Sequence, residues 1–241
     1  MRAVVLPGSG SDEVFVRAVF AVPLRALGID LQTVVPRPGG DVVAGYRAGL
    51  DAALAGPGPV LVGGISLGAH VAAMWAIEQP SGSGPAGLLL ALPAWTGPPR
   101  DAPAALTARA TAAYARAGGV EAAVAAARAG SPPWLAAELA RAWPRYGTGL
   151  ADALDAAASE PAPDAAGLRS LTVPTGIAAL VDDPVHPLAV AEHWCAQMPR
   201  AALVSAPLAA FGADPAVLGR AAVLGYLRAA HGRAQERAER S

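Results

Sequence analysis

Short apolar runs alternate along this chain with longer stretches in which apolar residues recur every three or four positions. The short runs have the length and aliphatic character of buried strands, and the longer stretches are typical of amphipathic helices. This alternation predicts βαβ units that build a mostly parallel sheet covered by helices. The expected strands are 3–6, 30–35, 60–63, 87–92, 176–181 and 201–205. The expected helices are 12–27, 42–55, a stretch that begins just after residue 66, and 214–230.

The alternation stops between residues 95 and 171, where no convincing strand pattern occurs. Ala-rich helical segments fill this stretch, and Gly and Pro separate them. The breaks fall at Gly119, 130–133, Gly147 and 161–163. We therefore expect a sheet core made of 1–94 and 172–241, with 95–171 inserted as a small helical cap.

The charge and cysteine content narrow the range of partners and locations. A formal net charge of −1 supplies no basic field to attract phosphates, so we expect no nucleic-acid partner. The single Cys195 cannot form an internal disulfide and agrees with a reducing compartment. The first residues leave no room for a signal peptide, and no apolar run approaches the roughly 20 residues that span a bilayer. The expectation is a cytoplasmic protein without a membrane segment.

The strongest chemical signal is a Gly-x-Ser-x-Gly motif at residues 64–68, centred on Ser66. An apolar strand precedes it and an apolar helix follows it, which is the context that a nucleophile elbow requires. Glycines at both ends let neighbouring backbone pass close to a strained turn. The helix that follows directs its first N–H groups toward the place where an oxyanion would develop in acyl transfer. Ser66 is therefore the candidate nucleophile.

On these residues the chain resembles the α/β-hydrolase superfamily over nearly its whole length. Ser66 matches the nucleophile, the helical insertion matches the lid, and Asp182-Asp183-Pro184 matches the loop that carries the acid. The resemblance implies a three-layer, mostly parallel sheet of about six strands that lacks the family's first two strands. It also implies a serine hydrolase.

The loop at residues 7–12 is similar to the family's oxyanion loop, with Pro7 in place of the usual histidine. By this resemblance, the backbone N–H groups of Ser9 and Leu67 would form the oxyanion hole. Asp183, directly before Pro184, best matches the acid, and Asp182 is the reserve. The alternative for either aspartate is that it only initiates a turn.

The family places its histidine after the last strand, but residues 206–215 contain none. A serine hydroxyl without a base is a poor nucleophile near neutral pH, so the four histidines need separate consideration. His186 is the preferred base, because the composition of residues 183–186 is that of a type I turn, which would bring it near Asp183. The alternative is an ordinary loop residue before the next helix, which Pro187 would begin.

The other three histidines are weaker candidates. His70 follows Ser66 by one helical turn, but its apolar helix favours a packed, hydrogen-bonded core histidine. His193 is expected on the helix after the acid loop, facing away, and His231 lies in the C-terminal tail. These scattered histidines give no metal-binding spacing, so we expect neither a metal nor another cofactor.

Five of the chain's nine Trp and Tyr residues lie in or beside the expected cap. They are Trp95, Tyr114, Trp134, Trp143 and Tyr146. They could form an apolar pocket for an acyl or ring group, or they could simply hold small Ala-rich helices together. The leading hypothesis is a serine hydrolase that cleaves a small ester or thioester through an acyl-enzyme at Ser66.

Two other functional classes stay open. The missing late histidine also fits a hydrolase-fold protein that has lost turnover and binds a small ligand or a partner. A dinucleotide-binding domain would use Gly8-Ser9-Gly10 after the first strand. This last reading is weak, because Glu13 stands where a third glycine is needed and no acidic residue ends the second strand.

Overall fold

The computed structural model describes the backbone of residues 1–80 and 82–238, and side chains as far as residue 231. Its centre is one six-stranded sheet in which every neighbouring pair of strands is parallel. The strand order is β2-β1-β3-β4-β5-β6. The strands are β1 (Arg2–Leu6), β2 (Asp30–Thr33), β3 (Val60–Ile65), β4 (Gly87–Ala91), β5 (Thr175–Leu180) and β6 (Ala201–Ala206). All six predicted strands are confirmed, and the second ends two residues earlier than expected.

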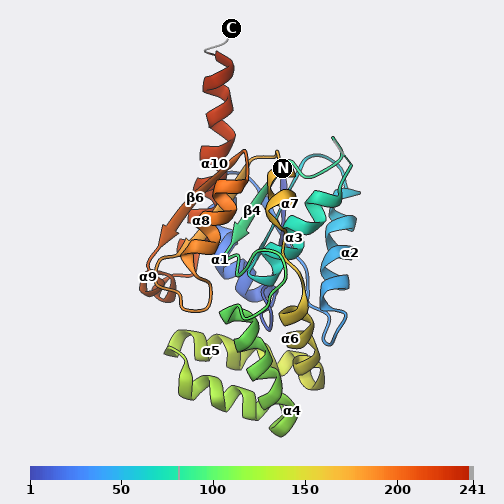
Figure 1. Ribbon diagram of the computed structural model, residues 1–241, viewed down its shortest axis with the longest axis vertical. Helices are drawn as coiled ribbons and strands as arrows, with labels where there is room; N and C mark the ends of the chain where they lie inside the picture. Colours follow the sequence, from blue (N-terminus) through green and yellow to red (C-terminus); the bar gives the residue numbers. More distant parts are fainter. Residues whose placement is uncertain (81, 239–241) are drawn as a thin grey trace.

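Helices cover both faces of the sheet, as the apolar patterns predicted (Figure 1). One face carries α1 (Glu13–Arg25) and α10 (Ala216–Ala238). The opposite face carries α2 (Val42–Leu54), α3 (Leu67–Glu78) and α8 (Leu188–Gln197). A short helix α9 (Leu208–Ala213) joins β6 to α10.

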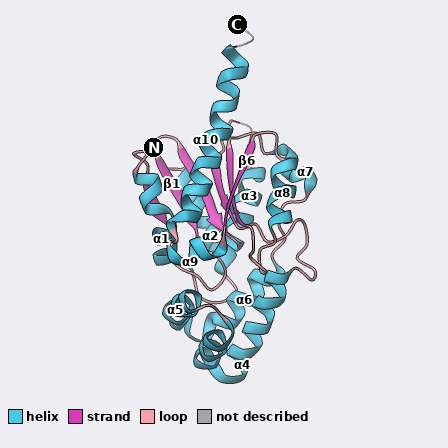
Figure 2. Cartoon of the chain, turned by 90° about the vertical axis from the view of Figure 1, so that its left-hand side faces the viewer, coloured by secondary structure: helices cyan, strands magenta, loops and turns pink. Residues whose placement is uncertain are grey.

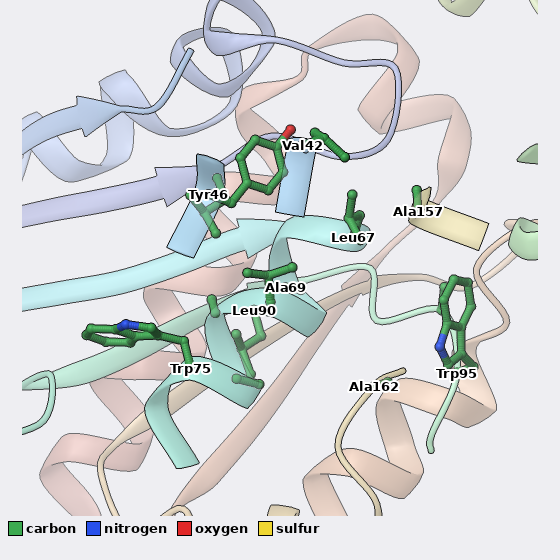
Figure 3. Packing of buried hydrophobic residues seen from close by; sticks show 14 of the residues in the cluster. Val42, Tyr46, Leu67, Ala69, Trp75, Leu90, Trp95, Ala157 and Ala162 are labelled. Atoms are coloured by element: carbon green, nitrogen blue, oxygen red, sulfur yellow. The ribbon is translucent and has the colours of Figure 1, made fainter. Parts of the chain in front are cut away.

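Alternate residues of each central strand point to opposite layers, because successive strand side chains face opposite sides of a sheet. Val62 and Leu90 belong to the cluster that packs on α2 and α3, and Leu61 and Leu89 belong to the cluster that packs on α1 and α10. Figure 3 shows Tyr46 of α2 and Trp75 of α3 among the side chains of the first cluster. The sheet is thus the middle of three layers, and it is buried on both faces.

No strand lies between β4 and β5, a stretch that the structure describes in full. The helices there are α4 (Pro103–Gly130), α5 (Pro133–Ala142), the 3₁₀ helix η1 (Trp143–Gly149), α6 (Leu150–Ser159) and α7 (Ala165–Ser170). Figure 2 shows α4, α5 and α6 gathered at one end of the sheet. By contrast, α7 packs against α3 and α8. Within α4, the non-helical backbone of Gly118 and Gly119 produces a kink, close to the break predicted at Gly119.

The register of the strands determines which loops meet at the carboxyl edge. Leu6, the last residue of β1, pairs with Gly64, and Gly64 pairs with Leu90 on its other side. The loop after β1 and the turn after β3 therefore leave the sheet side by side. The carboxyl edge of an open parallel sheet is where such folds bind their ligands.

Candidate active site

Ser66 occupies a strained turn between β3 and α3. Its backbone has φ 53° and ψ −114°, a conformation that residues with a Cβ rarely adopt. A Cβ on Gly64 would lie 2.1 Å from the carbonyl carbon of Gly68, and a Cβ on Gly68 would lie 2.6 Å from the carbonyl oxygens of Leu6 and Pro7. The two glycines of the motif are therefore required by close backbone contacts, as predicted.

His186 lies within hydrogen-bond distance of this serine. Its Nε2 is 2.9 Å from Ser66 Oγ, although 120 residues separate the two in the sequence. Its Nδ1 is 2.9 Å from Asp183 Oδ2. The structure thus brings together the three residues that the sequence singled out as nucleophile, acid and base.

Ser66, His186 and Asp183 form a chain of hydrogen bonds, which we call the relay. The hydrogen-bond partners of His186 determine which of its ring nitrogens carries the proton. An ionised carboxylate only accepts hydrogen bonds, so the Nδ1 of a neutral His186 carries the proton that it donates to Asp183. Nε2 is then left as an acceptor for the Ser66 hydroxyl. This is the arrangement in which an imidazole can take the proton of a serine.

Asp183 also holds the backbone of its own loop. Its Oδ1 accepts the N–H groups of Val185 at 2.8 Å and His186 at 3.2 Å, so the side chain closes the turn where the sequence suggested an ordinary backbone turn. Burial raises the pKa of Asp183, but the hydrogen bond and charge of His186 and the two N–H groups outweigh it, so the pKa lies below its usual value. Asp183 is thus held ionised next to the imidazole.

Asp182, the reserve acid, is used elsewhere. Its Oδ1 accepts the N–H of Leu208 at 2.6 Å, which ties the end of β5 to the start of α9. The segment 207–214, where the resembling family has its histidine, folds here as Pro207, the short helix α9 and Asp214. The imidazole beside Ser66 therefore comes from the loop after β5 and not from the loop after β6.

The proposed oxyanion donors lie on both sides of Ser66. Leu67 is the first residue of α3, and Ser9 belongs to the loop after β1, whose Gly8 would place a Cβ 3.5 Å from Ser66 Cβ. Within the part of the chain that the structure describes, neither the Leu67 N–H nor the Ser9 N–H donates to a protein acceptor. Both are therefore available for a ligand oxygen.

His70 is a core residue, as predicted. It is fully buried, and its Nε2 accepts the N–H of Ala94 at 2.9 Å. Its ring contacts Trp95 edge-on, with centroids 4.5 Å apart. Burial, reinforced by the nearby charge of His186, lowers the pKa of His70 to about 3, so this imidazole stays neutral.

The remaining two histidines take no part in the relay. His193 is exposed on α8, and His231 is exposed on α10, where its Nδ1 lies 2.7 Å from the carbonyl oxygen of Leu227. Across the residues described, no group of three or more His, Cys, Asp or Glu side chains could hold a metal ion. No helix in the described part of the chain is long and apolar enough to cross a membrane.

A surface groove of about 420 Å³ lies on the segment that follows the candidate base. Pro187, the residue after His186, forms part of its wall, and Trp95 forms another part. Its lining is almost entirely apolar and consists of Ala94, Trp95, Thr96, Ala102, Pro103, Pro187, Ala189, Val190 and His193. Such a surface suits an apolar group better than a charged one.

The other aromatic residues of the helical segment have different environments. Trp134 packs edge-on against Phe211, with ring centroids 5.2 Å apart. Trp143 and Tyr146 are buried against the loop after β1, whereas Tyr114 is exposed. Of the five aromatic residues considered from the sequence, only Trp95 lines the groove.

A cluster of charges beside the site was missed from the sequence. Arg141 and Arg145 both bind Asp12, which lies at the end of the loop that carries Ser9. The only available signal was the spacing of the two arginines, since side chains four residues apart lie on the same side of a helix. Nothing in the sequence indicated that Asp12, more than 120 residues away, was their partner.

Comparison with known proteins identifies the fold. No protein-family model matches the sequence, and no curated protein matches it. Many solved structures are similar, among them MenH from S. aureus, with a TM-score of 0.67, 18% identity, and 95% of this chain and 93% of that chain covered. A hydrolase from Pseudomonas aeruginosa PA01 has a TM-score of 0.65, 21% identity and coverage of 94% and 89%. A thermophilic esterase from Thermogutta terrifontis has a TM-score of 0.56, 20% identity and coverage of 86% and 81%. The chain has the α/β-hydrolase fold with a helical insert, as the sequence predicted.

Proposed function

We propose that this protein is a serine hydrolase that cleaves a small ester or thioester through an acyl-enzyme at Ser66. The observation that carries the proposal is the continuous relay from Ser66 Oγ to His186 Nε2 and from His186 Nδ1 to Asp183, with 2.9 Å at each step. Nucleophile, base and orienting acid within hydrogen-bond reach are the geometric signature of this chemistry.

In the first half of the reaction, Ser66 Oγ bonds to the carbonyl carbon of the substrate and its proton passes to His186 Nε2. The bond from that carbon to the alcohol or thiol then breaks, and the leaving group takes the proton from His186. In the second half, water attacks the acyl carbon and gives its proton to His186. The proton returns to Ser66 Oγ as the acid product leaves.

The negative charge that develops on the carbonyl oxygen needs donors that are already in place. The free N–H groups of Ser9 and Leu67, on the two sides of Ser66, fit this role. Asp183, ionised and bonded to Nδ1, would stabilise the imidazolium that forms when His186 accepts a proton.

The substrate class follows from the surroundings of the relay. The groove lined in part by Pro187 offers apolar walls to an acyl or ring group. Residues 95–171 would act as a cap, because α4, α5 and α6 stand at the sheet end where the relay lies (Figure 2). One of the similar structures is an esterase, which agrees with an ester as substrate.

A fluorophosphonate probe tests the proposal. Its phosphorus accepts Ser66 Oγ and loses fluoride, so mass spectrometry should find one phosphonyl group on the peptide that contains Ser66. Ser66→Ala should abolish labelling and the hydrolysis of p-nitrophenyl esters. Ser205→Ala, which removes an exposed serine from β6, serves as the control and should keep both. Unlabelled native protein would refute the proposal.

The competing hypothesis is a hydrolase-fold protein that binds a ligand without turnover. Its motive was the missing histidine after the last strand. His186, 2.9 Å from Ser66 Oγ, removes that motive, because an imidazole is within reach from another loop. Hydrolysis that depends on Ser66 would exclude the competing hypothesis.

A further inference from the structure

Three consecutive residues of the loop after β1 are held by the end of α5 and by η1. A Cβ on Gly10 would lie 2.7 Å from Trp143 Nε1, so the indole rests directly on this residue, whose φ of 64° also favours glycine. The Tyr146 hydroxyl donates to the carbonyl oxygen of Ser11 at 2.5 Å. Asp12 is the third residue held in this way, and it binds Arg141 and Arg145. The inserted helices therefore fasten the loop that carries Ser9.

Asp12 is the strongest of these attachments. Its side chain is 2% exposed, and Arg141 binds it in a two-pronged contact, Nη1 to Oδ2 and Nη2 to Oδ1, both at 2.7 Å. Arg145 adds a third bond to Oδ2 at 2.9 Å. Two parallel hydrogen bonds between a planar guanidinium and a carboxylate fix the relative orientation of the two groups as well as their separation.

The same carboxylate caps the helix that follows the loop. Its Oδ1 accepts the N–H groups of Val14 and Phe15, the second and third residues of α1. Burial raises the pKa of Asp12, but the bonds and charges of Arg141 and Arg145 and the Phe15 N–H outweigh it, so the pKa lies below its ordinary value. The link between the two segments is thus ionic at neutral pH.

This link ends three residues from the candidate oxyanion donor. On one side the loop contacts Ser66, since a Cβ on Gly8 would lie 3.5 Å from Ser66 Cβ. On the other side it is held at Gly10, Ser11 and Asp12 by the inserted helices. Ser9 lies between these two fixed stretches, so its N–H direction depends on both.

We propose that Asp12, bound by Arg141 and Arg145, is a positioning residue that aims the Ser9 N–H at the developing oxyanion. The inference rests on the proposed function and adds a role for the inserted helices: they set the geometry of the oxyanion loop as well as covering the site. The simpler alternative is that Asp12 only caps α1 and stabilises the fold. If Asp12 is a positioning residue, loss of the ionic link should slow the chemical step even in protein that remains folded. If Asp12 only stabilises the fold, folded variants should react at the native rate.

Asp12→Asn separates them, because asparagine keeps an oxygen to cap α1 but loses the charge that binds the arginines. We expect kcat for a p-nitrophenyl ester and the rate of phosphonylation at Ser66 to fall about 10- to 100-fold, with KM changed less than about threefold. Arg141→Lys, which keeps a charge but cannot form the two-pronged contact, should give an intermediate loss. Circular dichroism and a melting curve for each variant verify that it is folded at the assay temperature.

Arg116→Gln is the matched control. Arg116 binds Asp152 and Asp155 within the inserted helices, away from the oxyanion loop, so its loss should leave kcat and the labelling rate unchanged. Folded Asp12→Asn and Arg141→Lys proteins with native kcat and native labelling rate would overturn the inference alone. If Asp12→Asn does not fold, an unchanged kcat in Arg141→Lys is sufficient to overturn it. A native protein that fails to label would overturn the proposed function and this inference with it.

Discussion

His186 Nδ1 lies 2.9 Å from Asp183 Oδ2, and the two residues are only three positions apart in the chain. The proposed acid and the proposed base therefore come from one short loop after β5. Asp183 Oδ1 also binds the N–H groups of Val185 and His186, so one carboxylate sets both the backbone of the loop and the orientation of the imidazole. This loop places an imidazole next to Ser66, so no histidine from the segment after β6 is required there.

Asp183→Asn should therefore disable the relay while leaving the protein folded. An amide that donates to Nδ1 would force the imidazole into the tautomer whose Nε2 carries the proton and cannot accept one from Ser66. The expected loss in kcat is roughly 10⁴-fold, the size of the loss when the aspartate of a Ser-His-Asp triad is replaced by asparagine. Steady-state hydrolysis of a p-nitrophenyl ester at pH 8 measures it.

Asp182→Asn is the neighbouring control. Asp182 binds the Leu208 N–H, and asparagine keeps an oxygen for that bond, so kcat should stay within about threefold of native. If kcat fell as much in this variant as in Asp183→Asn, the assignment of Asp183 as the acid would be wrong. Native activity in Asp183→Asn would show that His186 does not need the Asp183 carboxylate in order to act as the base.

The glycines of the elbow should be intolerant of even one methyl group. The Cβ of Gly64→Ala would lie 2.1 Å from the backbone of Gly68, which cannot move without displacing α3. We expect a loss of about 3 kcal/mol or more in the free energy of unfolding, at the upper end of ordinary overpacking. Urea denaturation followed by circular dichroism measures this loss. Gly130→Ala is the control, because nothing lies within 4 Å of its Cβ, and it should be neutral or slightly stabilising. Equal stability of both variants would contradict the close packing at the elbow.

The strand pattern made the sheet predictable from the sequence. Fully buried strands such as β3 and β4 are continuous apolar runs, because helices cover both faces of the sheet. The pattern was weakest at β2, an edge strand whose residues alternate between exposed and half-buried, and the prediction there ran two residues too far. Edge strands carry less of the apolar signal because one side has no neighbouring strand.

The site was predictable only where its residues are close together in the sequence. Ser66 follows from the elbow motif, and the proximity of His186 to Asp183 follows from a turn of four residues. That His186 also reaches Ser66, 120 residues away, depends on the register of β3, β4 and β5, which the sequence does not specify. The pairing of Asp12 with Arg141 was unpredictable for the same reason, since 129 residues separate them.

His70 should make stability depend on pH in the range where unfolded histidine titrates. Its pKa is about 3 in the folded protein and near 6.5 when unfolded, so between these values the unfolded state binds one more proton. As the pH falls below 6.5, this group alone should lower the free energy of unfolding by up to about 1.4 kcal/mol per pH unit. Above pH 6.5 it should have no effect.

His70→Gln removes this titration and can keep an oxygen for the Ala94 N–H. Urea denaturation at pH 7.5, 5.5 and 4.5 should show a smaller loss of stability on acidification for the variant than for native protein, by roughly 2 to 3 kcal/mol at pH 4.5. His193→Gln, which replaces an exposed histidine on α8, should behave like the native protein. Parallel curves for native protein and His70→Gln would mean that the native imidazole accepts a proton in the folded state.

Asp12 should also lower the stability in acid, but at a lower pH than His70, because the fold stabilises the charged form of its carboxyl group. Its pKa in the folded protein lies below the ordinary value of 3.8, so its contribution is fully present above that value and is lost as the pH falls through the lowered one. At pH 7, Asp12→Asn should cost about 1–3 kcal/mol, since it loses charged hydrogen bonds while the arginines stay partly hydrated. Asp12→Ala should cost about 1 kcal/mol more, because the cap of α1 is lost as well.

The cost of Asp12→Asn should shrink as the pH is lowered from 4 to 2.5, because the native carboxyl then becomes neutral like the amide. Asp214→Asn is the surface counterpart: Asp214 also binds an arginine, Arg220, and the N–H of Ala216 near the start of α10, but it is half exposed. Its replacement should have much less effect at pH 7, since water screens an exposed pair. Equal losses in the free energy of unfolding for the two asparagine variants would mean that burial adds nothing to the strength of the Asp12 link. The inserted helices would then be held to the oxyanion loop by Trp143 and Tyr146 instead.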